Sequence, residues 1–399
     1  MVELMPVRIC QVCAVEFTYR KFLAPLAAAL SRQGYEVHAA FTPDQPEATT
    51  ECLELGPILF HPVTIARSNS PLALARSIWD LWQLFRHERF NVVHVHTPVA
   101  AIAARIAAAL ARVPLVFYTA HGFYFHERMP WFQRWLHISL EGLLAPLTNE
   151  LLTVSTEDAA LARRLRFKSA DHIHAIGNGV DIYRFTPPSP LLRQDRRDNF
   201  GLRSDAIVVG TVARLVSEKG YGELCDAFAQ LAPHFPQLQL LLCGSRLSSD
   251  HAGAVEQRIQ QLQRAFPGQV VTTGARDDVE AVYQAMDIFC LPSWREGLPY
   301  TVIEAMLTGL PVVATDIRGC REQVLPEVTG LLIPPGQSAP LAAAIERLLL
   351  DPGVRLRLGA MARQRALVLY DQTKVLQSQL DLYGQAIAAL KSPRQALSR

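Results

Sequence analysis

The sequence lacks a strong excess of charge of either sign. Its 39 lysines and arginines stand against 37 acidic residues, which gives a formal net charge of +2 over 399 residues. Proteins that bind nucleic acid usually carry a basic stripe or a high positive charge. We therefore expect no nucleic-acid partner, although this balance leaves room for a local patch that faces a membrane.

The beginning of the sequence lacks the pattern of a signal peptide, and the sequence has no uninterrupted long apolar run. Its beginning, MVELMPVRICQVCAV, has neither the basic start nor the long apolar core of a signal peptide. The most apolar long segment, Pro98 to Ala120, is interrupted by Arg105, Arg112 and Pro114. This segment predicts a buried helix followed by a strand, not a membrane span. We expect a cytoplasmic protein.

Cysteine clusters and two familiar loop motifs are missing as well. The 7 cysteines show no repeating spacing. Cys10 and Cys13 lie inside an apolar strand without a second pair, so we expect two buried thiols, not a metal or redox site. There is no Asp-x-Asp motif, the usual means of bringing a divalent metal to a nucleotide sugar, and no G-x-G-x-x-G dinucleotide motif. We therefore expect neither a metal ion nor a cofactor.

The sequence does contain a regular alternation of apolar strands and helices. In the first half, strands are predicted at Arg8–Val15, Glu36–Ala40, Leu59–Thr64, Asn91–His96, Leu115–Thr119, Leu151–Ser155 and His172–Ile176. Helices are predicted between them at Phe22–Arg32, Leu72–Arg86, Val99–Ala111, Trp131–Leu144 and Glu157–Leu165. Near-continuous apolar strands separated by helices indicate a parallel sheet that is covered on both faces.

A polar break separates this half from a second alternating region. The segment Tyr183–Asn199 is rich in proline and arginine and is typical of a linker. Strands are then predicted at Ala206–Thr211, Leu238–Cys243, Val270–Thr273, Ile288–Leu291, Val312–Thr315 and Gly330–Ile333. Because the chain exceeds what one core usually supports, we expect an α/β protein with two parallel-sheet domains and a cleft between them. These domains are 1–185 and 186–370, followed by a helical tail at about 371–399.

The most informative stretch is LPSWREGLPYTVIEAMLTGLPVVAT, which spans Leu291 to Thr315. Glu296 and Glu304 form an E-x7-E block around a Gly-Leu-Pro turn that opens a helix after an apolar strand. Strand, turn and helix in this order place the turn at the carboxyl edge of a parallel sheet, where open α/β proteins bind ligands. The first amide groups of the helix favour a phosphate at that edge.

Ordinary structural roles remain open for both acids. Thr301-Val302-Ile303-Glu304 also has the pattern of a capping box, in which Glu304 would accept a backbone N–H at the start of the helix. Glu296 could equally be a solvated loop charge. The choice between structure and function therefore depends on the other residues at this edge.

Two cations are predicted at the same edge of the second sheet. Arg214 and Lys219 follow the first strand of this sheet, within the run from Gly210 to Gly220. Arginine can bind a phosphate in a bidentate manner, and lysine adds a mobile point charge. With the start of the helix, they could hold a diphosphate, while the two carboxylates could accept hydrogen bonds from sugar hydroxyls. Two solvated surface cations are the alternative.

These motifs together resemble a known family. The run G-x-V-x-R-L-x3-K-G, the E-x7-E block and the Asn178-Gly179-Val180-Asp181 turn are similar to those of the retaining glycosyltransferases of family 4. The resemblance covers nearly the whole chain. It implies the GT-B fold of two facing Rossmann-like domains, with the last helix returning to the first domain.

The resemblance also implies roles for individual residues. Arg214 and Lys219 would bind the diphosphate of the donor, Glu296 would bind hydroxyls of the donor sugar, and Glu304 would bind the ribose. Arg276 would lie in the loop near the base. The donor site would be completed by the turn residues Gly297, Leu298 and Pro299.

On the first domain, the resemblance implies that His121 contacts the donor sugar and takes part in catalysis, with Arg214, Lys219 and Glu296. His121 directly follows a predicted strand, in the sequence YTAHGFYF. This sequence and Val93-His94-Val95-His96-Thr97-Pro98 are similar to a narrower group that builds capsules, exopolysaccharides or lipid-diphosphate-linked glycans. Core packing explains His94 and His96 nearly as well as binding of an acceptor.

The first strand-to-helix turn departs from the pattern of the family. Residues 14–20, AVEFTYR, lack the paired glycines that many members place beside the diphosphate. Donor contacts from this turn are therefore in doubt, and Glu16 and Arg20 become candidates for the acceptor side. Two segments that mix aromatic residues and cations, Met129–Leu136 and Arg163–Lys168, are typical of a membrane interface or of a core-facing helix with a solvated side.

We therefore expect a metal-independent retaining glycosyltransferase with a nucleotide-diphosphate sugar donor, expected to be a UDP-sugar. The expected acceptor is a glycan or a lipid-linked glycan, and the sequence leaves a peripheral contact of the enzyme with the membrane open. A nucleotide-sugar epimerase or a glycan phosphorylase has the same two-domain design. A catalytically silent binding subunit is a further alternative.

Overall fold

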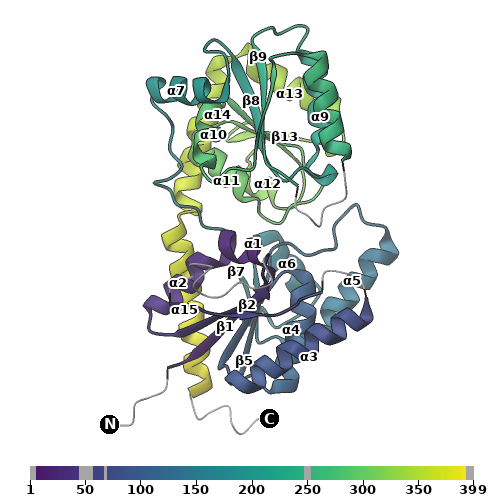
Figure 1. Cartoon of the computed structure of the whole chain (residues 1–399), viewed down its shortest axis with the longest axis vertical. Helices are drawn as coiled ribbons and strands as arrows, with labels where there is room; N and C mark the ends of the chain where they lie inside the picture. The colour runs from purple at the N-terminus through teal and green to yellow at the C-terminus, as the bar shows by residue number, and fades with distance from the viewer. Residues whose placement is uncertain (1–5, 45–56, 67–69, 247–252, 392–399) are drawn as a thin grey trace. The chain divides into compact units, whose positions relative to one another are not determined.

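The chain forms two compact units, and each is a parallel sheet with helices on both faces (Figure 1). The computed structural model describes residues 6–44, 57–66, 70–246 and 253–391. The first unit comprises Met1–Gly177 and Lys374–Arg399, and the second comprises Asn178–Thr373. The expected α/β class with two Rossmann-like sheets is confirmed.

The first unit contains a seven-stranded sheet in the order β3-β2-β1-β4-β5-β6-β7, with every neighbouring pair parallel. Its strands are β1 (Arg8–Val15), β2 (Glu36–Thr42), β3 (Leu59–Pro62), β4 (Val92–His96), β5 (Leu115–Ala120), β6 (Glu150–Thr153) and β7 (Ile173–Ala175). Because all strands are parallel, their carboxyl ends form one edge of the sheet.

Two apolar cores cover the faces of this sheet. Its helical segments are α1 (Glu16–Thr18), the π-helix η1 (Tyr19–Leu23), α2 (Ala24–Arg32), α3 (Pro71–Glu88), α4 (Pro98–Ala111), α5 (Trp131–Leu144), η2 (Ala145–Leu147), α6 (Thr156–Arg164), η3 (Ala170–His172) and most of α15 (Gln372–Lys391). Ser70 and Ser155 cap α3 and α6 through their hydroxyl oxygens, as expected for serine before a helix. Cys10 and Cys13 are fully buried thiols, as predicted.

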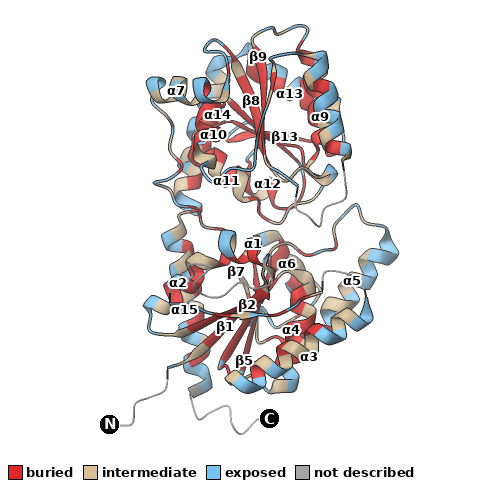
Figure 2. Ribbon diagram, in the orientation of Figure 1, coloured by how far each residue is buried: buried red, intermediate tan, exposed pale blue. Residues whose placement is uncertain are grey.

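The second unit contains a six-stranded parallel sheet in the order β10-β9-β8-β11-β12-β13. Its strands are β8 (Ile207–Val212), β9 (Leu238–Cys243), β10 (Val270–Gly274), β11 (Ile288–Leu291), β12 (Val312–Thr315) and β13 (Gly330–Ile333). Its helices are α7 (Pro190–Phe200), η4 (Ser217–Lys219), α8 (Tyr221–Leu231), α9 (Ala254–Ala265), α10 (Val279–Ala285), α11 (Tyr300–Leu307), α12 (Cys320–Gln323), α13 (Ser338–Leu350) and α14 (Pro352–Leu369). In both units the central strands are buried and the outer helix faces are exposed (Figure 2).

The structure corrects the prediction of a linker at Tyr183–Asn199, because most of that segment is the helix α7. Ser189 caps the helix through its hydroxyl oxygen, and Pro190 begins it. The helix docks through a cation: Arg197 is buried, and its guanidinium lies 2.6 Å from the carboxylate of Asp287. A helix that is held by a buried arginine shows no apolar periodicity, which is why the sequence pattern missed it.

The division between the units lies between Gly177 and Asn178, whereas the sequence placed it at 185. The reason is that the chain after Asn178 pairs with the end of the second unit. The Val180 N–H donates to the carbonyl of Tyr370 (2.9 Å), and the Gln372 N–H donates to the carbonyl of Val180 (3.1 Å).

Candidate active site

The carboxyl edge of the second sheet brings Lys219 and Glu296 together. Lys219 follows β8 and Glu296 follows β11, and these two strands are parallel neighbours in the sheet. Lys219 Nζ lies 2.7 Å from Glu296 Oε1, and the two side chains are only 18% and 9% exposed. An ion pair with this little exposure is screened less than a surface pair, so its charges act strongly on anything that binds beside it.

A second set of charges lies beside this pair. The Glu218 carboxylate receives Arg214 Nη2 at one oxygen and Arg295 Nη2 at the other, each at 3.3 Å. The two loops are also joined through the backbone, because the Trp294 N–H donates to the carbonyl of Glu218 (2.8 Å). Arg214 therefore lies at the edge where the sequence placed it. The sequence reasoning did not identify Arg295.

Two glycines allow these loops to approach so closely. Gly220 has a φ of +76°, and a Cβ there would lie 2.0 Å from the carbonyl oxygen of Pro292. Gly319 has a φ of +85°, and a Cβ there would lie 2.2 Å from the carbonyl oxygen of Gly297. Because any larger residue would be strained and would collide with backbone, these glycines hold the loops after β8 and β12 against the turn that carries Glu296.

The turn that carries Glu296 is anchored by its carbonyl groups. Asn178 Nδ2 donates to the carbonyl of Leu298 (2.6 Å), and Gln323 Nε2 donates to the carbonyl of Pro299 (3.0 Å). Helix α11 follows from Tyr300, with Pro299 as a cap that provides no side-chain hydrogen bond. The N–H end of the helix is thus presented at the edge where Lys219 and Glu296 lie.

The capping-box interpretation of Glu304 is wrong. The cap of α11 is Pro299, so Thr301 lies inside the helix and not before it. The Glu304 carboxylate instead accepts a hydrogen bond from the hydroxyl of Tyr283 at 2.7 Å. Burial and this carboxylate raise the pKa of Tyr283 well above its ordinary value, so the phenol stays protonated and donates to Glu304.

Arg276 lies at the same edge but away from this cluster. It follows β10, and both β9 and β8 lie between β10 and β11 in the sheet. Its guanidinium forms hydrogen bonds of 2.8 and 2.7 Å with Asp278 and lies 5.1 Å from the centroid of the Phe200 ring. The structure therefore separates Arg276 from Lys219 by one strand and from Glu296 by two.

In the first unit, His121 directly follows β5 and belongs to a polar network. Its Nε2 lies 3.2 Å from Nδ1 of His96, and His96 Nε2 lies 2.9 Å from the amide oxygen of Gln11. His94, on the same strand as His96, contacts the hydroxyls of Thr119 and Tyr383. His94 and His96 are therefore buried, hydrogen-bonded residues beneath the sheet edge.

Burial keeps these histidines neutral. It lowers the pKa of His94 to about 3 and that of His121 to about 4, and it lowers the pKa of His96 well below the ordinary value. Loss of hydration disfavours the charged imidazolium, and for His94 and His96 the neighbouring rings add to this effect. At neutral pH the three rings can therefore exchange hydrogen bonds but carry no charge.

The turn after β1 has no glycines because the strand continues directly into a helix. Strand β1 leads straight into α1 with Val15 as the cap, and the helix continues through the π-helical residues Tyr19–Leu23. Glu16 is largely buried, and its Oε1 lies 2.6 Å from Nε of Arg20. Its other oxygen accepts the Asp44 N–H (3.0 Å). Both candidates for the acceptor side are thus paired with each other.

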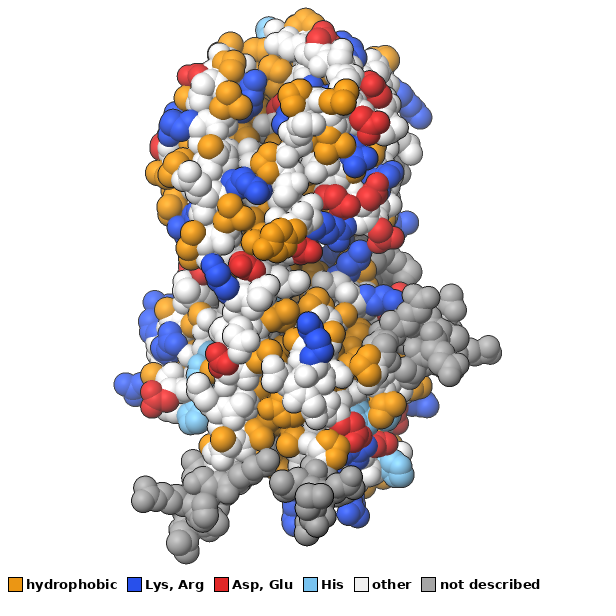
Figure 3. Space-filling model, turned by 90° about the vertical axis from the view of Figure 1, so that its left-hand side faces the viewer, with side chains coloured by type: hydrophobic (Ala, Val, Ile, Leu, Met, Phe, Trp, Pro, Cys, Tyr) orange, Lys and Arg blue, Asp and Glu red, His pale blue; other side chains and the backbone are white. Residues whose placement is uncertain are grey.

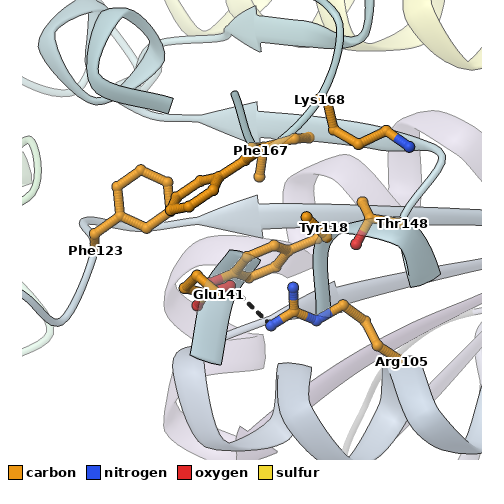
Figure 4. Close-up of a pocket in the computed structure, with 9 residues that line it drawn as sticks. Arg105, Tyr118, Phe123, Glu141, Thr148, Phe167 and Lys168 are labelled. Atoms are coloured by element: carbon orange, nitrogen blue, oxygen red, sulfur yellow. Dashed lines mark hydrogen bonds and ion pairs between the residues drawn. The ribbon is translucent and has the colours of Figure 1, made fainter. Parts of the chain in front are cut away.

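A small cavity of the first unit contains a buried ion pair (Figure 4). Arg105 Nη2 lies 3.0 Å from Glu141, and the hydroxyl of Tyr118 donates to the same carboxylate at 3.1 Å. The Arg105 guanidinium also lies 4.4 Å from the centroid of the Tyr118 ring. Each charge has its partner inside the unit, so Arg105 is a structural residue. Pro98 to Ala120 forms α4 and β5, as predicted.

Helix α5 exposes an apolar surface. Its large exposed side chains are Trp131, Phe132, Trp135, Leu136 and Leu143, whereas its buried residue is Leu144. Within the described part of the chain, no helix combines the length and apolar character that a bilayer crossing requires. On the face drawn in Figure 3, basic and acidic side chains are interspersed over the second unit, in keeping with the small net charge.

The two sheets and their carboxyl edges define a class of protein. The architecture is that of GT-B glycosyltransferases, and solved members of this class superimpose on nearly the whole chain. Sucrose-phosphate synthase from Thermosynechococcus elongatus matches with a TM-score of 0.79 and 23% identity, covering 96% of this chain and 100% of the other. HepE from Anabaena, in complex with UDP-glucose, matches with a TM-score of 0.76 and 23% identity, covering 95% and 99%.

Sequence comparison identifies the family. Residues 193–365 match the model for glycosyl transferases group 1, and residues 18–179 match the glycosyl transferase 4-like domain. EpsD of Bacillus subtilis (strain 168), to which a glycosyltransferase activity is assigned provisionally, is 31% identical over 382 residues, or 93% of this chain and 95% of its own. The chain therefore belongs to the group 1 glycosyltransferases with a 4-like first domain, and it is an enzyme of this class.

One further relative carries a specific activity in its name. The UDP-Gal:α-D-GlcNAc-diphosphoundecaprenol α-1,3-galactosyltransferase of Escherichia coli is 27% identical over 323 residues, covering 78% of this chain and 82% of its own. These matches favour a glycosyltransferase over the epimerase and the phosphorylase that share the two-domain design.

Proposed function

We propose that this enzyme transfers a sugar from a nucleotide-diphosphate donor to a glycan or lipid-linked glycan acceptor, with retention of the anomeric configuration. The observation that carries the proposal is the Lys219–Glu296 pair (2.7 Å) at a sheet edge beside the start of α11. A cation and a helix N-terminus stabilise the charge that develops on a leaving diphosphate. A carboxylate beside them accepts hydrogen bonds from sugar hydroxyls.

In this proposal, Arg214 and Lys219 bind the diphosphate, and Glu296 binds the donor sugar. The same donor site is lined by the turn residues Gly297, Leu298 and Pro299. Glu304, whose carboxylate accepts a hydrogen bond from Tyr283 at 2.7 Å, binds the ribose. Because Tyr283 is buried, its hydroxyl holds the Glu304 carboxylate in one orientation.

His121 takes part from the first unit as a contact to the donor sugar. Arg276 is assigned to the base, because it follows the edge strand β10 and lies away from the diphosphate cluster. Retention proceeds without a covalent enzyme intermediate: the acceptor attacks from the face that the diphosphate leaves, and the departing phosphate helps to take the proton of the acceptor. The proposed diphosphate site consists of protein cations and amide groups, so no metal is assigned to it.

The donor is proposed to be a UDP-sugar. HepE is described in complex with UDP-glucose, and the E. coli relative takes its galactose from UDP-Gal. The lipid-linked acceptor rests on the diphosphoundecaprenol named for that relative. The proposed setting is the assembly of a surface polysaccharide, since another relative, from Staphylococcus aureus, is named as a capsular polysaccharide glycosyltransferase.

A donor panel tests this function. UDP-, GDP- and ADP-sugars should differ in how far they raise the melting temperature, because a ligand at 100 times its Kd stabilises the native state by about 2.7 kcal/mol. A UDP-sugar that stabilises the protein should then be transferred to a lipid-diphosphate sugar, with the anomer of the product read by NMR. An inverted product, or full reversible loss of activity with a chelator, would overturn the mechanism. Binding without transfer to any acceptor would favour a silent subunit.

We also propose that α5 contacts the membrane that holds a lipid-linked acceptor. Its Trp131 and Trp135 are 75% and 62% exposed, and aromatic side chains on an amphipathic helix favour the bilayer interface. The double change Trp131→Ala with Trp135→Ala should reduce flotation with vesicles that contain anionic phospholipid. Leu191→Ala, at a similarly exposed apolar position of the second unit, is the control. Equal flotation of all three proteins would exclude this contact.

A further inference from the structure

A chain of side-chain hydrogen bonds crosses the first unit and ends at His121. Its members, in order, are Thr119, His94, Tyr383, Gln11, His96 and His121. They come from strands β5, β4 and β1, from the residue that directly follows β5, and from the C-terminal helix α15. Tyr383 is the link from α15, and 372 positions separate it from its partner Gln11.

The contacts around Tyr383 and His94 are short and buried. His94 lies 2.7 Å from the Thr119 hydroxyl and 2.6 Å from the Tyr383 hydroxyl. The Gln11 amide nitrogen donates to the same Tyr383 oxygen at 2.9 Å. The ring of Tyr383 is stacked on Phe117, with the ring centroids 4.6 Å apart and 8° between the planes. Stacking of the ring on Phe117 and the hydrogen bonds at the oxygen together fix the position of the Tyr383 hydroxyl.

The orientation of the Gln11 amide, with its nitrogen toward Tyr383 and its oxygen toward His96, gives the chain one direction. Because the Gln11 nitrogen can only donate, Tyr383 accepts from it and gives its own proton to Nδ1 of His94. The Gln11 oxygen can only accept, so Nε2 of His96 must carry a proton. In a neutral His96 ring, Nδ1 is then an acceptor, and it receives the Nε2 proton of His121 at 3.2 Å. His121 is left with an unprotonated Nδ1.

We propose that Tyr383 is a positioning residue that fixes the tautomer of His121 through Gln11 and His96. The consequence is that His121 presents a hydrogen-bond acceptor at Nδ1 and not a donor. This inference rests on the proposed function at one point, namely that a hydroxyl of the donor sugar donates a hydrogen bond to Nδ1 of His121. A sugar hydroxyl can donate to an imine-type nitrogen, whereas a protonated Nδ1 would leave that hydroxyl proton without an acceptor.

The variant Tyr383→Phe isolates the hydroxyl, because phenylalanine can keep the stacking on Phe117. Without the hydroxyl, the Gln11 amide loses its acceptor and can turn over. It would then offer its nitrogen to Nε2 of His96 and reverse the protons at His96 and His121. NMR of protein labelled with 15N in histidine distinguishes the two ring nitrogens, and His121→Ala assigns the signal.

The expected spectrum of the native protein has the proton of His121 on Nε2, and that of Tyr383→Phe shows a mixture of both tautomers. The expected kinetic effect of Tyr383→Phe is a fall in kcat of about 3- to 10-fold, the size of one net hydrogen bond, with little change in KM for the donor. Tyr19→Phe is the control, since Tyr19 is another buried tyrosine of the first unit and is stacked on Phe41. It should leave the tautomer and kcat unchanged.

The two kinds of failure can be distinguished. The positioning role is excluded if the His121 tautomer is the same in Tyr383→Phe and the native protein, or if it changes while kcat does not. If His121→Ala transfers sugar at the native rate, the role of His121 in the proposed function fails, whereas the spectrum still decides whether Tyr383 sets the tautomer. A matching loss of kcat in Tyr19→Phe would show that the effect comes from packing alone and would also overturn the proposal.

Discussion

The two sheet edges of this enzyme have the same construction, but the side chains proposed to act there differ in charge. At the edge of the second sheet, charged groups are paired at close range, with Lys219 against Glu296 and Glu218 between two arginines. At the edge of the first sheet, His94, His96 and His121 are neutral because burial lowers the pKa of each. Parallel β-strands with helical crossovers thus supply two different kinds of site.

The difference lies in the segments that cover each edge. At the edge of the second sheet, Gly220 and Gly319 let the neighbouring backbone segments approach closely. The side chains of Lys219 and Glu296 pair there and remain 18% and 9% exposed. In the first unit, α15 places Tyr383 and other apolar side chains over the sheet, which removes water from the polar groups beneath. Loss of water disfavours the charged form of a histidine, so the cover over the first sheet keeps His94 and His96 as neutral hydrogen-bond partners.

The largest effect is expected from the charged edge. Lys219→Ala should lower turnover by about 10²- to 10³-fold, the loss typical of one preorganised group that stabilises developing charge. Glu304→Ala should give a fall of the same order, since its carboxylate is oriented by Tyr283. Release of nucleoside diphosphate in the presence of acceptor measures both.

The matched control is Arg258→Ala, which removes a surface cation of the same unit that pairs with Asp226. An exposed ion pair contributes little, so this variant should keep its activity. If both Lys219→Ala and Glu304→Ala turned over donor at nearly the native rate, the proposed roles of the second edge would be wrong.

A smaller effect, on stability, is expected from the neutral edge. An unfolded histidine has a pKa near 6.5, whereas that of His121 is about 4 and that of His94 about 3. As the pH falls below about 6.5, the unfolded chain therefore binds protons that the native state does not. Each such histidine should lower the free energy of unfolding by about 1.4 kcal/mol per pH unit. Above about pH 7 this loss is absent.

Hydrogen exchange separates the two units in this test. Between about pH 7 and about pH 5.5, after correction for intrinsic exchange rates, amides of β1, β4 and β5 should lose more protection than amides of β8 and β11. His121→Gln should reduce the pH dependence of the first unit, because one depressed histidine is removed. Equal losses in the two units would show that the buried histidines do not set the acid sensitivity.

Much of the fold was accessible from local patterns. The apolar strands, the alternation with helices and the placement of Lys219 and Glu296 after parallel strands all result from periodicity and turn residues. Pro299 correctly indicated the beginning of α11. Helix α7 escaped because it is anchored by Arg197 and not by an apolar stripe. The capping-box pattern at Glu304 failed because Pro299 already occupied the cap position.

By itself, the sequence determined two parallel α/β sheets, the loops that carry Arg214, Lys219 and Glu296, and the helix that carries Glu304, because these features depend on residues that are near one another in the chain. Only the tertiary structure decided which of these side chains meet, that Tyr283 orients Glu304, and that Tyr383 reaches His94 and Gln11. Those contacts join segments far apart in the sequence. No local propensity encodes them, since they exist only once packing has excluded water and fixed the distance between partners.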